Sequence, residues 1–530
     1  MDWTKSSGEP LTSEMRGKYE GLQAVRWVAI GLAMACLAVF GQAVRFAFLN
    51  YDDNAYITEN PWVRGGLTLP GLIWAFRNID YFYWQPLTWI SHMLDCQLFG
   101  LRAGWHHAGS IALHAANCVL VFAILRRTTG AVWRSAAAAA LWALHPLRLE
   151  SVAWIAERKD VLSAFWFLVM AWAYVRYVER PSRPQYWAVM GALACGLMSK
   201  PMLIMAPALL LVLDWWPLKR RAWAEKIPLF GMAAATLAIT YVGTSHGEWM
   251  NWAAKVPLWH RSANAVVNYA AYLWLTVWPR RLAILYPYRM EIPWWQPAGA
   301  AVLIAAASWA AWRYRLRYPY VAAGWVWFAV AILPPIGVVQ VGRQAMADRF
   351  TYIPAIGLAV AAVWGAAELS GRRALAGGLA GAAVAACAGA SLAHIGTWRD
   401  SVTVWENAVA VTGDNSGAQH YLASALDDVG RWRESLPHHA EAVRIEPKHF
   451  IAQYAYGLCL EREGRWEAAA EHFGAAVRGF AGYGDARFHL GMDWIRLGRT
   501  AEGRAELERA LALGLSEADG AEARRVLAAQ

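Results

Sequence analysis

Long apolar stretches alternate with short polar connections over the first 400 or so residues of the chain. A helix of about 20 apolar residues is long enough to cross the hydrocarbon core of a bilayer. The pattern therefore predicts an all-α, polytopic membrane helix bundle with about 11 spans. We place these spans at about 24–49, 106–126, 131–147, 161–178, 185–199, 202–217, 226–244, 298–312, 320–341, 351–368 and 374–395.

The polar segments between the spans differ in character. Residues 1–23 are polar and are predicted to form a cytoplasmic N-terminal segment. Residues 50–105 are rich in aromatics and proline, and we expect a large loop whose short helices lie against the membrane interface. The stretch 262–279 is apolar enough to cross, but loop orientation is consistent only if it stays in the interface on the outer side.

Basic residues set the orientation, because cytoplasmic loops of membrane proteins carry an excess of Lys and Arg. Such clusters fall in every second loop, which places the 50–105 loop and the C-terminal region on the outer side. The clusters are Arg126/Arg127/Arg134, Arg176/Arg180/Arg183, Lys219/Arg220/Arg221/Lys226, Arg313/Arg315/Arg317 and Arg372/Arg373.

The pattern changes at about residue 399, where a charged, alanine-rich segment begins and continues to residue 530. Gly-Arg pairs at 430, 464 and 498 recur at a constant step of 34 residues, and Ala418, Ala452 and Ala486 keep the same step. This period is typical of tetratricopeptide repeats, whose paired helices stack into an α-solenoid. We predict three units, at about 416–449, 450–483 and 484–517.

Composition agrees with a membrane protein, since 58% of residues are hydrophobic and only 17% are charged. The net charge of +10 lies largely in the loops, so orientation explains it better than nucleic-acid binding. Four of the six cysteines fall in predicted spans and none forms a C-x-x-C pair, which argues against a disulfide framework or a zinc site.

Two adjacent carboxylates, Asp52 and Asp53, directly follow the first span. A carboxylate at this place can take a proton from an incoming hydroxyl group. The alternative is that both acids end a helix and are simply solvated, because Asp is an ordinary loop residue.

Further ionisable residues lie at span ends on the same predicted side, which suggests a shared cavity. Arg and Lys in such a cavity could hold an anionic lipid phosphate, Arg through paired hydrogen bonds and Lys as a point charge. Each group could also be an ordinary solvated loop or a side chain reaching for the interface. The candidates are His145, Glu150, Glu157, Arg158, Lys159, Asp160, Lys200, Asp348 and Arg349.

Histidines cluster in and after the first large loop, at His92, His106, His107 and His114. Their spacing matches no known set of metal ligands, and we interpret them as interfacial residues. No metal is therefore expected.

Several segments, in order, resemble the bacterial relatives of the transmembrane-and-tetratricopeptide O-mannosyltransferase family, within the GT-C glycosyltransferase superfamily. They are YDDNAYITENPWVRGGLT from residue 51, WQPLTWISHMLDCQLFGL from 84, HPLRLESVAWIAERKDVLS from 145, SKPM from 199 and QVGRQAMADRFTYIP from 340. The resemblance covers nearly the whole chain from about residue 46.

The resemblance implies a GT-C-type bundle over about 24–398 and transfer of a sugar from a polyprenyl-phosphate donor, with inversion, to a protein Ser or Thr hydroxyl. It further implies a multi-pass protein of the cytoplasmic membrane with its repeats on the periplasmic side, and catalysis without a metal. An acid in the first outer loop would be the base, and we favour Asp53 over Asp52 because it lies further from the span. Arg148 and Leu149 depart from the HPLHVE form of relatives, which puts a role for a second histidine there in doubt.

Other functions stay open at this point. The same donor could serve a lipid or polysaccharide acceptor, although the repeats favour a protein acceptor or partner. A transporter or flippase would need inverted repeats and broken spans near the membrane midplane, and the sequence shows neither. A non-catalytic docking protein would leave the clustered outer charges unexplained.

Overall fold

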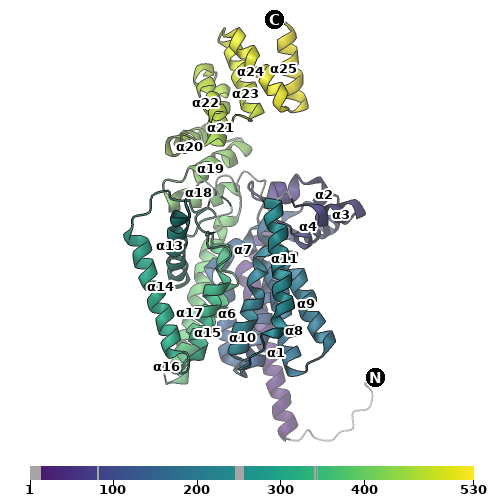
Figure 1. Cartoon of the computed structure of the whole chain (residues 1–530), viewed down its shortest axis with the longest axis vertical. Helices are drawn as coiled ribbons and strands as arrows, with labels where there is room; N and C mark the ends of the chain where they lie inside the picture. The colour runs from purple at the N-terminus through teal and green to yellow at the C-terminus, as the bar shows by residue number, and fades with distance from the viewer. Residues whose placement is uncertain are drawn as a thin grey trace. The chain divides into compact units, whose positions relative to one another are not determined.

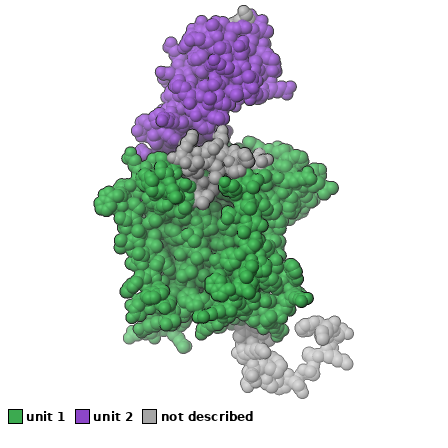
Figure 2. All heavy atoms as spheres, in the orientation of Figure 1, with its two compact units in different colours: residues 1–280, 290–399 green, residues 281–289, 400–530 purple. Residues whose placement is uncertain are grey.

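The computed structural model describes residues 13–79, 83–244, 256–338, 342, 344–369 and 371–529. Residues 1–12 of the predicted N-terminal segment thus lie outside the described residues. Over the described ranges the chain is all-helical, with no β-strand. It divides into two compact units, residues 1–280 with 290–399 and residues 281–289 with 400–530, which Figure 2 colours separately.

The first unit is a bundle whose long helices run side by side (Figure 1). A helix lies at each of the predicted spans. These helices are α1 (Ser13–Phe40), α5 (Ala103–Thr129), α6 (Val132–Ala143), α8 (Arg158–Glu179), α9 (Arg183–Leu197), α10 (Ala206–Trp215), α11 (Ile227–Thr244), α14 (Trp295–Tyr314), α15 (Pro319–Ala331), α16 (Pro354–Leu369) and α17 (Arg373–His394).

Among the described residues, five helical stretches are long and apolar enough to cross a membrane: Gln23–Arg45, Ala103–Thr129, Ile155–Glu179, Ala224–Gly243 and Arg373–Trp398. Three shorter apolar helices accompany them, at Pro201–Trp215, Pro319–Ala331 and Pro354–Glu368. The chain is thus a multi-pass helical membrane protein, and the count of about 11 spans stays a prediction.

Short helices replace spans in the 50–105 loop, and α2, α3 and α4 lie at one end of the bundle (Figure 1). Capping residues start two of these helices: Asn60 accepts hydrogen bonds from the amides of Trp62 and Val63, and Thr68 accepts one from Gly71. The elements are η2 (Asn54–Thr58), α2 (Pro61–Arg64), α3 (Leu69–Arg77) and α4 (Pro86–Phe99).

The stretch predicted to lie in the interface forms α13 (Leu258–Val277). Polar residues interrupt its apolar surface, since the amide groups of Asn264 and Asn268 both donate to the carbonyl of Ala345. The hydroxyl oxygen of Tyr272 accepts a 3.1 Å hydrogen bond from the amide of Ala347. These contacts tie α13 to the 345–348 segment, which reaches the candidate site described below.

Short turns connect the long helices and carry most of the candidate residues. The long helices themselves pack closely: a methyl group on Gly324 of α15 would lie 2.3 Å from the carbonyl oxygen of Gly357 on α16. The short elements are η1 (Gly41–Arg45), η3 (Pro146–Arg148), α7 (Leu149–Ala153), η4 (Ile155–Glu157), η5 (Pro201–Met205), η6 (Ala224–Lys226), η7 (Asp348–Thr351) and η8 (Ile395–Trp398).

The second unit consists of successive antiparallel helix pairs. The first helices of three pairs begin at Ser416, Phe450 and Gly484, a constant step of 34 residues. Ala418, Ala452 and Ala486 are completely buried at the close approaches, and the tetratricopeptide assignment stays a prediction. The helices are α18 (Ser401–Thr412), α19 (Ser416–Asp428), α20 (Trp432–Ile445), α21 (Phe450–Arg462), α22 (Trp466–Gly479), α23 (Gly484–Arg496), α24 (Thr500–Leu513) and α25 (Glu517–Ala529).

Candidate functional site

The two adjacent acids of the first loop have different surroundings. Asp53 is completely buried, and both of its carboxylate oxygens accept backbone hydrogen bonds, from Leu49 N and from Ala156 N, each at 2.8 Å. Burial raises the pKa of Asp53 to about 7 despite these two hydrogen bonds. Asp53 therefore fastens the end of the first span to the turn that precedes α8.

Asp52 faces charged side chains instead of the backbone. It is partly exposed, and among the described residues its carboxylate has no hydrogen bond or ion pair. Burial raises its pKa above that of an ordinary aspartate, and the positive charge of Lys159 partly offsets this rise. Glu157 and Arg349 also act on it electrostatically. Asp52 is thus the acid of the pair with an available oxygen.

Glu157 is the centre of the charged side chains near Asp52. Its Oε1 lies 3.1 Å from Lys159 Nζ and 3.2 Å from Arg349 Nε, and its Oε2 lies 3.4 Å from Lys200 Nζ. The side chains of Glu157, Lys159 and Lys200 are more than nine-tenths buried, and that of Arg349 is 11% exposed. Water therefore screens these charges weakly. Three segments far apart in sequence thus bring one cation each to a single carboxylate.

Two more carboxylates bind the far sides of these cations. Asp160 pairs with Lys200 and accepts a 3.2 Å hydrogen bond from Ser151 Oγ. Glu150 pairs with the Arg349 guanidinium and accepts from the Arg349 amide at 2.8 Å. Burial raises the pKa of Glu150 to about 7, with the charge of Arg349 opposing the rise. We call Asp52, Glu150, Glu157, Lys159, Asp160, Lys200 and Arg349 the loop cluster.

Tyr56 contacts the loop cluster, although the sequence analysis does not name it as a candidate. Lys159 Nζ lies 4.5 Å from the centroid of the Tyr56 ring and 3.4 Å from its hydroxyl, which also accepts from Gln85 Nε2 at 2.9 Å. Tyr56 lies one turn after Asp52 in a short helical segment, and this spacing is the signal that could have pointed to it.

Arg158 is not part of the loop cluster, although its two sequence neighbours are. Its guanidinium lies 2.7 Å from Asp95 Oδ2, its Nε donates to Ser110 Oγ at 2.9 Å, and it also donates to the carbonyl of His106. Arg158 thus joins α4 to α5 on the other side of the turn.

His145 and Asp348 lie behind the loop cluster. His145 Nε2 donates to the carbonyl of Thr276 at 3.0 Å. Asp348 is buried and its charge acts on Arg148, whose pKa burial lowers to about 10. Arg148 donates to Thr351 of η7, so these residues hold the segment that carries Arg349.

An open cavity of about 380 Å³ adjoins the loop cluster. Lys200, Arg349 and Asp160 form its charged wall, Ser163 and Tyr352 add two hydroxyl-bearing side chains, and apolar side chains form the rest. The apolar lining includes Met202, Leu203, Met205, Ala331, Pro335, Phe350, Ile353 and Pro354. A site with cations at one wall and aliphatic carbon at the other suits an amphipathic anion.

The first unit is thus a multi-pass helical membrane bundle with a buried charged cluster beside an amphipathic cavity. Comparison with known proteins shows what parts of the chain resemble. The family model described as dolichyl-phosphate-mannose-protein mannosyltransferase matches residues 89–243. This range contains Glu157, Lys159, Asp160 and Lys200.

Individual relatives agree with that match. The chain is 30% identical over 170 residues to protein O-mannosyl-transferase Tmtc2 of Drosophila melanogaster, covering 29% of this chain and 18% of that protein. It is 28% identical over 185 residues to human TMTC1, covering 33% of this chain and 20% of that protein. The matches thus span about a fifth of the relatives' length. Over these matched segments, the predicted resemblance to protein O-mannosyltransferases is confirmed.

A solved structure is also similar to the chain. It is the crystal structure of ArnT from Cupriavidus metallidurans bound to undecaprenyl phosphate, at 18% identity and a TM-score of 0.37, covering 85% of this chain and 80% of that one.

Proposed function

We propose that the chain is a membrane glycosyltransferase that moves a sugar from a polyprenyl-phosphate donor to a protein Ser or Thr hydroxyl, with inversion. The observation that carries this proposal is the loop cluster, in which Lys159, Lys200 and Arg349 converge on Glu157. Lys200 and Arg349 also line an amphipathic cavity, and Lys159 and Arg349 act electrostatically on Asp52. The relationship to protein O-mannosyltransferases supports the same reaction class.

Asp52 is the base in this proposal, in place of Asp53. A Ser or Thr hydroxyl is a weak acid, so a base must take its proton as the new bond to the anomeric carbon forms. Asp52 has a carboxylate without a hydrogen-bond partner among the described residues, whereas both oxygens of Asp53 accept backbone amides. The raised pKa of Asp52 makes it a stronger base than an ordinary aspartate.

Lys200 and Arg349 hold the leaving group. As the acceptor oxygen bonds to the anomeric carbon, the bond from that carbon to the phosphate oxygen breaks and its electron pair leaves with the lipid phosphate. The charge that develops there is stabilised by cations already in place. Because the cations converge on Glu157, a phosphate can take over part of the contacts that this carboxylate makes. A single displacement inverts the anomeric centre.

The lipid chain has a route along α15 and α16. One turn beyond Ala331 and Ile353 of the first cavity lie Trp327 and Gly357, which line a second cavity of about 620 Å³. Its lining is almost wholly apolar and comes from α5, α8, α10, α15 and α16. Such a lining accepts a polyprenyl chain at no cost in unpaired polar groups.

The second unit favours a protein acceptor. Stacked helix pairs present an extended surface of the kind that binds polypeptide. We place the first loop and the second unit on the periplasmic side of the cytoplasmic membrane, and no metal takes part in the transfer step.

The test is transfer by the purified full-length protein in lipid nanodiscs. Radiolabelled dolichyl-phosphate mannose, and the same donor with other sugars, is incubated with a Ser/Thr-rich peptide library. We expect label on peptide, released by base-catalysed elimination, and loss of most activity in Lys200→Met. Arg64→Gln, which removes an exposed cation of the 50–105 loop, is the control and should keep full activity.

Two results would overturn the proposal. One is a folded protein that transfers label from no lipid-phosphate donor to any acceptor. The other is transfer that proceeds equally well in Lys200→Met. Label recovered on lipid or polysaccharide only would keep the donor chemistry and reject the protein acceptor.

A further inference from the structure

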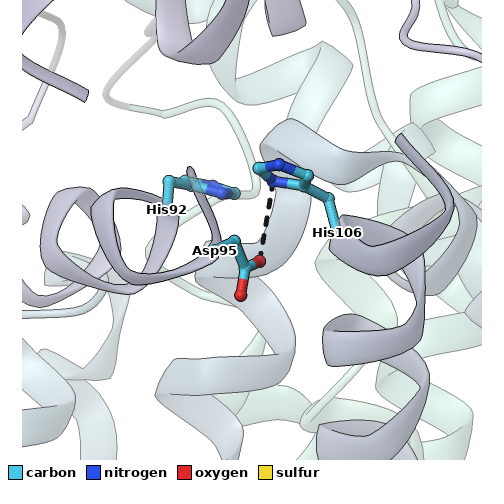
Figure 3. Close-up of side chains that lie close together, drawn as sticks. All are labelled: His92, Asp95 and His106. Atoms are coloured by element: carbon cyan, nitrogen blue, oxygen red, sulfur yellow. Dashed lines mark ion pairs between the residues drawn. The ribbon is translucent and has the colours of Figure 1, made fainter. Parts of the chain in front are cut away.

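Two histidines and an aspartate form a compact group between α4 and α5, outside the loop cluster. His92 and Asp95 lie one turn apart on α4, and His106 faces them from α5. Figure 3 shows the three side chains pointing toward one another, and one potential ligand atom from each lies within 4.8 Å of the others. All three residues are buried.

The hydrogen bond of His106 determines which of its nitrogens is available. Its Nε2 lies 3.0 Å from the carbonyl oxygen of Gly100, which can only accept, so Nε2 carries the proton. The lone pair of the neutral ring is then on Nδ1, which lies 3.6 Å from Asp95 Oδ2 and has no hydrogen-bond partner. Two electron-rich atoms facing each other in a buried place are unfavourable unless a positive charge lies between them.

His92 is completely buried, and among the described residues neither of its ring nitrogens makes a hydrogen bond. Buried polar groups are almost always paired, so an imidazole of this kind requires an explanation. A neutral imidazole keeps a lone pair on one nitrogen, and this lone pair can bind a cation.

We propose that His92, Asp95 and His106 bind a zinc ion or a similar divalent transition metal. Two imidazoles and one carboxylate are a common zinc ligand set, and a water molecule would complete the tetrahedron. Tetrahedral ligands about 2.1 Å from the metal lie about 3.4 Å apart. The 3.6 Å between His106 Nδ1 and Asp95 Oδ2 already approaches this separation.

The surroundings supply the outer partners that such a site needs. A metal-bound histidine usually donates its second N–H to a carbonyl, as His106 does to Gly100. Arg158 holds the Asp95 carboxylate at 2.7 Å and is itself fixed by Ser110. Its charge lowers the affinity for a cation, but it leaves lone pairs of the carboxylate available. The ion would be structural, joining the first loop to α5.

The test is zinc binding by the full-length protein in detergent, purified with a tag that lacks histidine and stripped with a chelator. Because Asp427, His439 and Cys459 form a second group of potential ligands, all proteins carry Cys459→Ala. Binding is measured by competition with a chromophoric chelator and by elemental analysis. We expect one zinc per chain and at least about a tenfold loss of affinity in His92→Ala.

His92→Gln keeps the size of the side chain if His92→Ala fails to fold, and His107→Gln is the matched control on α5. Zinc should raise the melting temperature of the parent and of His107→Gln, but not of His92→Gln. Cobalt should give the visible absorption of a tetrahedral site in the parent. A folded parent that binds no zinc, or equal binding by His92→Gln and the control, would overturn the proposal. The proposal would also be overturned if the melting temperature changed with pH but not with zinc. A proton on His106 would then account for its contact with Asp95.

Discussion

Two buried charged clusters in the first unit use the same kinds of residues in different ways. In one, Lys226 pairs with Asp214, donates to Tyr174 and also donates to the carbonyl of Ala222 at 2.9 Å. Tyr174 in turn donates to Asp214 at 2.6 Å. None of these four residues lines either cavity described above. We call them the Asp214 cluster.

The loop cluster has an acid left over and a cavity beside it. Asp52 faces the cations without a partner among the described residues, and Lys200 and Arg349 form part of the cavity wall. A buried charge is tolerated when it is paired, and a fully paired cluster has no capacity for a ligand. Both clusters contain charged groups. The structural cluster is distinguished from the candidate catalytic cluster because its charged groups are all paired, whereas an acid of the catalytic one lacks a partner among the described residues.

The largest expected effect is on Asp52. Asp52→Asn removes the base but keeps the size of the side chain, so we expect transfer to fall by about 10²–10⁴-fold while the protein stays folded. Transfer from the labelled donor and the melting temperature are measured together. Glu59→Gln, an exposed acid in the same loop, is the control and should change neither. Full activity in folded Asp52→Asn would remove Asp52 as the base.

A substitution in the Asp214 cluster should change stability instead. Asp214→Asn removes the nearer counter-charge of the buried Lys226 and leaves only Glu225, at 3.8 Å, and breaking such a buried pair costs about 3–5 kcal/mol. Glu225→Gln breaks a more exposed pair with Arg220 and should cost less than about 1 kcal/mol. Thermal unfolding in detergent measures both. Transfer per folded molecule should be unchanged in each, and a specific loss of transfer in Asp214→Asn would contradict the structural role.

The pH dependence of transfer should show the raised pKa of Asp52. A base acts only when unprotonated, so activity falls about tenfold per pH unit below its pKa, and this fall begins above the range of an ordinary aspartate near 3.9. Initial rates are measured across pH at low donor concentration. Glu150, with a pKa of about 7, titrates in the same region, so the profile is repeated in Glu150→Gln. A flat profile down to ordinary aspartate values would contradict the assignment.

The smallest expected effect is on Asp53. Asn keeps only one acceptor oxygen, so one of the two backbone amides loses its partner at a cost of about 1–3 kcal/mol. We expect Asp53→Asn to melt earlier and to transfer sugar within a few-fold of the parent. Comparison with Asp52→Asn in the same assay decides between the two acids. A loss of transfer as large as that of Asp52→Asn, without a loss of stability, would return the base to Asp53.

The sequence predicted the positions of the long helices because apolar runs and turn residues determine them locally. It also suggested a shared cavity for the ionisable residues at span ends. Glu150, Glu157, Lys200 and Arg349 lie in contact, whereas Arg158 pairs with Asp95, and the functional role of these residues stays a prediction. What the sequence could not predict is the direction of each side chain.

Neighbouring residues in a helical turn point about 100° apart, so Arg158 and Lys159 reach different partners. Arg158 pairs with Asp95, while Lys159 pairs with Glu157. Asp52 and Asp53 diverge in the same way, and their separation depends on a turn near Ala156, about a hundred residues away. Tyr56 contacts Lys159 and Asp95 contacts Arg158 only because tertiary packing brings them together, and no local sequence pattern encodes these contacts.

The two backbone hydrogen bonds of Asp53 also restrict how the site can move. They join the end of the first span to the turn that carries Glu157 and Lys159, so these residues and Asp52 form one rigid wall. Lys200 and Arg349 belong to other segments, around η5 and η7. In the proposed transfer reaction, we therefore expect the displacement that admits and releases a lipid phosphate to fall on that second wall, while Asp52 and Glu157 keep a constant separation.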